Sequence, residues 1–143
     1  MTDSFSGLNN DINGKSVSDY QNFLVSKMNY AIEVALRNVN SNFFTATPNH
    51  CHDNADDYCI INPKCKKVEG WLTITYPKSP FTTIASHSVV LLENGELIDI
   101  TPMAIQQKSK FLPSFLDTDT YKKLINYLYE TKGQTTMFVT NTK

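Results

Sequence analysis

Apolar positions at helical spacing along the chain predict three helices. In the first helix these positions include Tyr20, Leu24 and Ala31, which would form one buried stripe. The segment 16–19 resembles a capping box that starts this helix, and an Asn-Pro pair stops the second one. The expected helices span about 16–38, 50–61 and 118–132.

Period-two alternation and short apolar runs predict four strands. Asn94-Gly95 stands between two of the runs, and this dipeptide is the strongest short signal for a β-hairpin. A loop rich in Lys and Ser separates the hairpin from the third helix. The expected strands are 70–76, 85–92, 97–101 and 134–140. This order of elements predicts an α+β domain with helices on a mainly antiparallel sheet.

The first 15 residues differ in composition from the rest of the chain. They are polar, contain Asn13-Gly14 and show no apolar period, so we expect residues 1–15 to be a flexible N-terminal segment. The remaining residues, 16–143, are enough for one domain with its own core. No repeat or low-complexity tract divides them.

Charge and hydropathy exclude several classes of partner. Lys and Arg number 13 against 14 acidic residues, with no clustered basic face, so we expect no nucleic-acid partner. No apolar run approaches the roughly 20 residues of a membrane span, so we expect no membrane partner either. The polar N-terminus lacks a signal-peptide core, which favours a cytoplasmic protein, although a specialised export route would leave no such signal.

The chain contains three cysteines, Cys51, Cys59 and Cys65, which cannot all pair with one another. At least one free thiol is therefore expected, and a reducing compartment fits this best. We interpret Cys59 and Cys65 as structural residues, since free cysteines are often simply buried.

Cys51, His87 and Asp99 form the most informative pattern in the sequence. Cys51 opens a polar helix, where free amides and the helix dipole favour a thiolate. His87 and Asp99 fall on the paired strands of the hairpin, offset diagonally across it. We therefore expect a thiol nucleophile, its general base and the residue that orients the base.

Four segments around these residues resemble the papain-like cysteine enzymes, and within them the transglutaminase-like group. They are the helix opening 51–54, the Gly70-Trp71 strand entry, the strand start 87–90 and the turn 99–102. The resemblance implies a papain-like fold, a Cys51-His87-Asp99 triad and acyl chemistry on an amide or thioester. It implies a peptide, protein or thioester substrate and no cofactor, and it leaves hydrolysis, glutamine deamidation and acyl transfer open.

The stabilisation of an oxyanion is less well defined. The Cys51 amide is one donor, and Asn49 or Asn54 is a candidate for the second. Asn49 serves equally well as a simple helix cap. We find no counterpart of the oxyanion glutamine of papain-like enzymes. Trp71 is a candidate for positioning substrate, although such an aromatic residue more often belongs to the core.

Three alternatives compete with the triad. Zinc-ligand residue types occur at His50, Cys51, His52, Cys59 and Cys65. Their spacing matches no known zinc motif, so no metal site is expected. His50 or His52 could serve as the base, but neighbours on a helix point about 100° apart. The third alternative is a non-catalytic binding protein on the same fold, with a buried cysteine, a core histidine and a strand-end turn.

Overall fold

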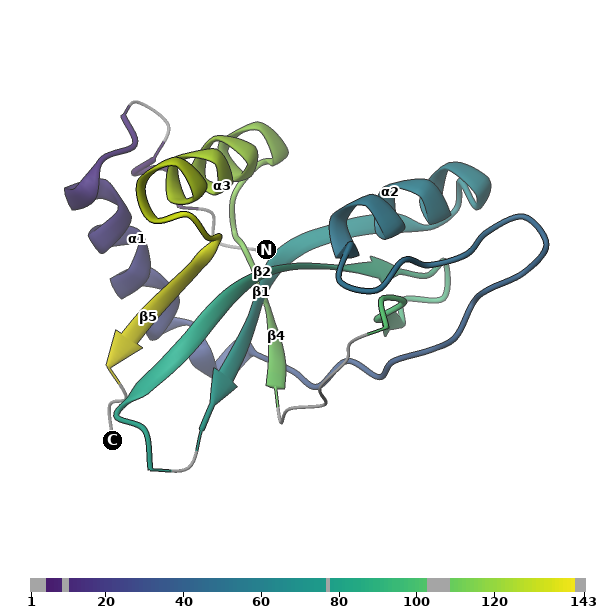
Figure 1. Cartoon of the computed structure of the whole chain (residues 1–143), viewed down its shortest axis with the longest axis horizontal. Coiled ribbons are helices and arrows are strands. Elements are labelled where there is room, and N and C mark those ends of the chain that lie inside the picture. Colours follow the sequence, from purple (N-terminus) through teal and green to yellow (C-terminus); the bar gives the residue numbers. More distant parts are fainter. Residues whose placement is uncertain (1–4, 9–10, 77, 103–108, 141–143) are drawn as a thin grey trace.

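The sheet is built around β2 (Phe81–Leu91), which pairs along one edge with β1 (Lys66–Thr75). The computed structural model describes residues 5–8, 11–76, 78–102 and 109–140. The other edge of β1 pairs with β4 (Ser109–Pro113), and the strands of the sheet pair with one another in antiparallel fashion. Together with three helices packed on it, this curled sheet confirms the expected α+β class (Figure 1).

Two short strands share the remaining edge of β2. β3 (Leu97–Ile98) pairs with Val90 and Leu91, whereas β5 (Thr136–Thr140) pairs with residues 81–85. Residues 86–89 of β2 therefore lie between the two partners. This interval contains His87 and Ser88.

The helices divide the core into two main parts. α1 (Gly14–Ser26) and α3 (Thr118–Lys132) pack around Trp71 and Ile84, and α2 (Cys51–Ile61) packs against β1 and β2 near Val90. In Figure 1, α1 and α3 lie together at one end of the sheet and α2 lies at the other. The expected ranges of the second and third helices are confirmed, because α2 begins within one residue of its prediction and α3 has the predicted bounds.

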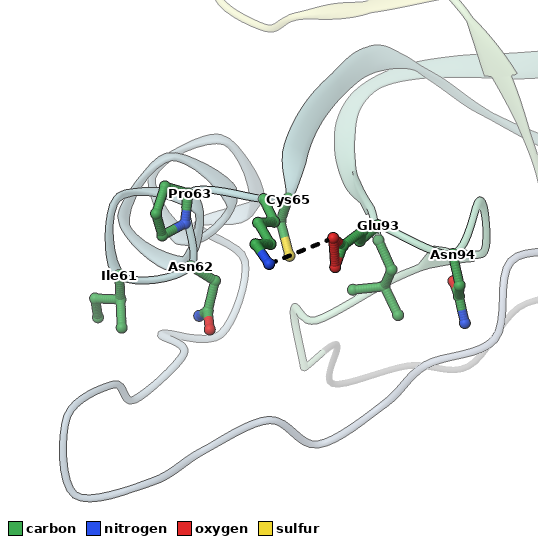
Figure 2. A pocket seen from close by; sticks show the side chains of 8 residues that line it. Ile61, Asn62, Pro63, Cys65, Glu93 and Asn94 are labelled. Atoms are coloured by element: carbon green, nitrogen blue, oxygen red, sulfur yellow. Dashed lines mark ion pairs between the residues drawn. The ribbon is translucent and has the colours of Figure 1, made fainter.

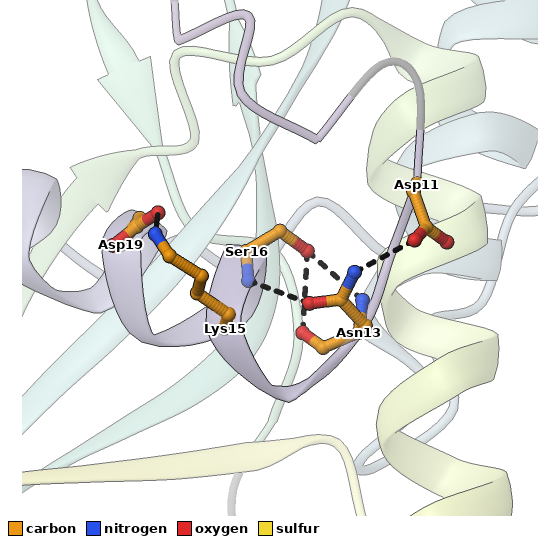
Figure 3. A network of polar contacts seen from close by, with 5 residues as sticks. All are labelled: Asp11, Asn13, Lys15, Ser16 and Asp19. Atoms are coloured by element: carbon orange, nitrogen blue, oxygen red, sulfur yellow. Dashed lines mark hydrogen bonds and ion pairs between the residues drawn. The ribbon is translucent and has the colours of Figure 1, made fainter.

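The first helix starts earlier and ends much earlier than its pattern indicated. Its capping box joins Asn13 and Ser16, whose side chains each accept a hydrogen bond from the other's backbone amide at 2.9 Å (Figure 3). The Asn13 amide group also donates to Asp11, and Lys15 pairs with Asp19 one turn along. The predicted box at 16–19 was therefore displaced by about one turn.

The prediction of helix over 27–38 was wrong. After a short 3-10 turn, Met28–Tyr30, the chain runs extended beside the sheet. Ile32 bridges Phe111, and Leu36 bridges Asp99. Pairing with the sheet gives these backbone groups partners that the local pattern could not reveal, and tertiary pairing of this kind overrides a weak helical preference.

Two further segments differ from expectation. β4 lies in the segment expected to be a Lys- and Ser-rich loop. Its two buried apolar residues, Phe111 and Leu112, form a run too short to predict a strand. The middle of that loop, 103–108, lies outside the described residues. Within the expected flexible lead-in, Phe5 donates its amide to the Phe115 carbonyl, and Leu8 is buried in the core.

Among the described residues, the helices are all too short or too polar to cross a bilayer.

Candidate active site

Cys51 is the first residue of α2, and a tight turn presents it there. His50 is the N-cap residue and makes no side-chain capping hydrogen bond. Asn49 has a left-handed φ of 64°, and its amide donates to the Pro102 carbonyl at 3.3 Å. The amides of a first helical turn have no partner within the helix. The Cys51 thiol therefore stands beside free backbone donors.

Asn54 fixes this helix start to its surroundings. Its Oδ1 accepts the Thr47 amide at 2.9 Å, and its Nδ2 donates to the Thr47 carbonyl at 2.8 Å. The same Nδ2 donates to Thr101 Oγ1 at 3.0 Å. Because Asn54 is buried and both amide hydrogens are engaged, its hydrogen bonds hold the backbone and leave none for a substrate.

His87 and Asp99 meet across the hairpin. Continuing the β2–β3 register places Asp99 opposite Val89, which makes His87 its diagonal neighbour on the same face. His87 Nε2 lies 2.7 Å from Asp99 Oδ2, and both residues are buried. Asp99 Oδ1 accepts the Thr101 amide at 3.1 Å. Both carboxylate oxygens are thus occupied, and the other ring nitrogen of His87, Nδ1, remains for the thiol.

The backbone of Asp99 is also held. Two hydrogen bonds join it to the extended segment after the first helix. The Asp99 amide donates to the Ala35 carbonyl at 3.0 Å, and the Arg37 amide donates to the Asp99 carbonyl at 2.8 Å. Segment 31–38, which the sequence pattern wrongly predicted to be helical, therefore supports the backbone of Asp99, the residue that contacts His87.

The thiol and the imidazole shift each other's pKa toward an ion pair. Burial by itself raises the pKa of Cys51, but interactions of the thiol with the His52 and His87 rings lower it to about 6. Burial by itself lowers the pKa of His87, but the hydrogen bonds and charges of Asp99 and Cys51 raise it to about 9. At neutral pH the arrangement therefore favours a thiolate beside an imidazolium.

His52 is a second imidazole at the thiol. Its Nδ1 lies 2.6 Å from Ser88 Oγ, and its ring meets Tyr121 edge to face, with 5.9 Å between the centroids. His52 Nε2 is buried and has no hydrogen-bond partner among the described residues. The sequence had favoured His87 over His52 because adjacent helical residues diverge. Only the fold shows that Ser88, on β2, holds the His52 ring by a hydrogen bond and that this ring lowers the pKa of Cys51.

Gly70 allows the sheet to close tightly behind His87. It pairs with His87 on one side and with Pro113 on the other. A Cβ at this position would overlap the Leu112 carbonyl oxygen and come within 2.8 Å of the Phe111 ring. The Gly70 carbonyl accepts the Tyr121 hydroxyl at 2.7 Å.

Trp71 has no exposed surface for a substrate. It is fully buried, and its indole Nε1 donates to the Tyr20 hydroxyl at 2.8 Å. The Tyr20 hydroxyl in turn donates to the Ser114 carbonyl at 2.6 Å. The structure therefore places Trp71 in the core, as the more common behaviour of such residues indicated, and gives it no contact with Cys51 that would position a substrate.

Two cavities flank α2 at different places. The larger, of about 750 Å³, lies between the end of the helix and the β2–β3 turn, where Lys64 and Glu93 form an ion pair of 3.6 Å (Figure 2). The 11-residue helix separates it from Cys51 by about 15 Å. The smaller, of about 330 Å³, is lined by His52, the residue after Cys51, and by Tyr121.

Within the described part of the chain, no three His, Cys, Asp or Glu side chains gather to hold a metal ion. Cys59 and Cys65 instead pack, partly buried, beside the apolar cluster under α2. Burial and the neighbouring Cys65 raise the pKa of Cys59, the opposite direction from that of Cys51.

Comparison of the chain with protein-family models, with curated proteins and with solved structures gave no match. The chemistry of the site must therefore be inferred from its own residues.

Proposed function

We propose that this protein is a cysteine-dependent enzyme that carries out acyl chemistry on an amide or thioester. One observation supports this most strongly: the His87 ring lowers the pKa of the Cys51 thiol, and the far nitrogen of that ring lies 2.7 Å from the buried carboxylate of Asp99. A plain structural cysteine has no need of such neighbours.

In the proposed reaction the Cys51 thiolate attacks the carbonyl carbon, and the carbonyl electron pair moves to oxygen. The Cys51 amide at the helix start donates to this oxyanion. His87 then gives its proton to the departing amine or thiolate, and an acyl-enzyme thioester remains. A water molecule or an amine, deprotonated by the now neutral His87, then attacks the thioester carbonyl carbon, and the C–S bond breaks to release the acyl product and the Cys51 thiolate.

Asp99 acts through His87 in this scheme. Its carboxylate accepts a hydrogen bond from His87 Nε2, so that Nδ1 faces the sulfur, and its charge stabilises the imidazolium. A cysteine at a helix start, with its histidine and aspartate on antiparallel strands, also supports the proposal that the fold belongs to the papain-like group, near its transglutaminase-like members.

The proposal is tested by acylation of the thiol itself, which requires no knowledge of the natural substrate. The protein is incubated with p-nitrophenyl acetate, and p-nitrophenolate release and protein mass are followed. We expect one acetyl group on Cys51 of the wild type. We also expect the wild type to release p-nitrophenolate at least about 100-fold faster than Cys51→Ala or His87→Ala. Cys59→Ala is the matched control and should react like the wild type. Equal rates in the wild type and in folded Cys51→Ala would refute the proposal.

A further inference from the structure

The hydrogen bond between His52 and Ser88 determines which His52 nitrogen carries the proton. Ser88 is buried, and His52 Nδ1 is the sole partner of its hydroxyl among the described residues. If Nδ1 donated, the buried hydroxyl hydrogen would have no acceptor. The hydroxyl therefore donates to Nδ1, and the proton of the neutral ring is on Nε2.

The resulting Nε2–H is a buried donor that has no acceptor among the residues the structure describes, and such groups are rare in folded proteins. It stands on the residue next to Cys51, and its ring acts on that thiol. The same ring borders the smaller cavity together with Tyr121.

We propose that His52 Nε2–H is the second donor of the oxyanion hole and stabilises the negative oxygen that forms when Cys51 adds to a carbonyl. This inference rests on the proposed function. It assigns the role for which no glutamine counterpart was found in the sequence, and for which Asn54 has no free hydrogen. His52 is then an electrostatic partner of the reaction, and His87 remains the sole base.

Two reactions of Cys51 separate this role from a general effect on the thiol. Acylation by p-nitrophenyl acetate passes through a tetrahedral oxyanion; collapse then re-forms the carbonyl and expels p-nitrophenolate, which leaves without needing a proton. Alkylation by iodoacetamide displaces iodide from carbon and forms no oxyanion. The ratio of the two rates therefore measures stabilisation of the oxyanion alone.

The variants are His52→Phe, which keeps an aromatic ring but removes the donor, and His52→Gln, whose amide nitrogen can reach the position of Nε2. Loss of one oxyanion donor typically lowers rate by 10²–10³-fold. We expect the acylation-to-alkylation ratio to fall about 100-fold in His52→Phe and to recover to within about tenfold of wild type in His52→Gln. Ser88→Ala, which frees the tautomer, should lower the ratio by a smaller factor.

An unchanged ratio in folded His52→Phe would overturn the inference, as would equal losses in both reactions. Thermal unfolding and circular dichroism establish which variants are folded. If His52→Phe does not fold, the ratio in Ser88→Ala decides, and an unchanged value there contradicts the assigned tautomer. Failure of the proposed function gives a different result, because wild-type Cys51 would then be neither acylated nor unusually reactive toward iodoacetamide.

Discussion

Asn54 Nδ2 donates to Thr101 Oγ1 at 3.0 Å and thereby joins the helix that carries Cys51 to the strand end that carries Asp99. The Thr101 amide in turn donates to Asp99 Oδ1. The nucleophile and the residue that orients the base are thus linked by a short chain of buried hydrogen bonds that does not pass through His87.

Replacing Asn54 with Ala should therefore affect both stability and reactivity. The change leaves the Thr47 amide and carbonyl without their buried partner, so we expect the free energy of unfolding to fall by about 1–3 kcal/mol. Cys51 should also lose acylation rate under conditions where the variant is fully folded. Asn62→Ala, which removes a side-chain bond at the far end of the same helix, is the control and should leave the acylation rate unchanged.

Replacing Asp99 with Asn keeps the shape of the side chain and removes its charge. Since the hydrogen bond and charge of Asp99 raise the pKa of His87, that pKa should move down from about 9 in the variant. Acylation of Cys51 should slow at least about tenfold, but less than in Cys51→Ala. A pH titration of the His87 ring by NMR measures the shift, and an unmoved pKa would show that Asp99 does not act on the ring.

The pH dependence of the reaction follows from the same two groups. The pKa of Cys51 is lowered to about 6, so the thiolate is present above that pH, and alkylation by iodoacetamide should slow as pH falls through about 6. The pKa of His87 is raised to about 9, so its proton is lost above that pH, and turnover of a substrate with a poor leaving group should decline there. An ordinary thiol would instead show alkylation rising only above about pH 8.

Gly70 offers a test of the packing behind His87. Gly70→Ala places a Cβ against the Leu112 carbonyl and the Phe111 ring, and both of these residues are buried. We expect it to lower the free energy of unfolding by about 1–3 kcal/mol or more. Gly14→Ala is the matched control, because nothing lies within 4 Å of its Cβ, and an Ala in α1 should be neutral or stabilising. Equal melting temperatures for the two variants would contradict this packing.

The strongly patterned elements could be predicted from the sequence. The third helix has an Asp117 cap and the left-handed Gly133 at its end, so both of its bounds were readable. The Asn94-Gly95 dipeptide predicted the hairpin that carries His87 and Asp99 and their diagonal offset, but counting from a two-residue turn made that offset one residue larger than the observed register, in which Val90 pairs with Ile98. These signals are local, which is why they needed no knowledge of the tertiary fold.

The errors in the prediction occurred where tertiary pairing decides the structure. Segment 31–39 carries apolar residues at near-helical spacing, but Phe111 and Asp99 give its backbone strand partners. The role of His52 was hidden for the same reason, because its ring is oriented by Ser88, which is 36 residues distant in sequence. Neither contact leaves a pattern in a single sequence.

The central claim is that Cys51 is a thiolate at neutral pH because of His87, and competitive labelling tests it most directly. The folded protein is treated with limiting iodoacetamide at pH 7, and the modification of each cysteine is quantified by peptide mass spectrometry. We expect Cys51 to react at least about tenfold faster than Cys59 and Cys65, which pack against an apolar cluster, and His87→Ala to remove that advantage. Equal labelling of the three cysteines in the folded wild type would contradict the claim.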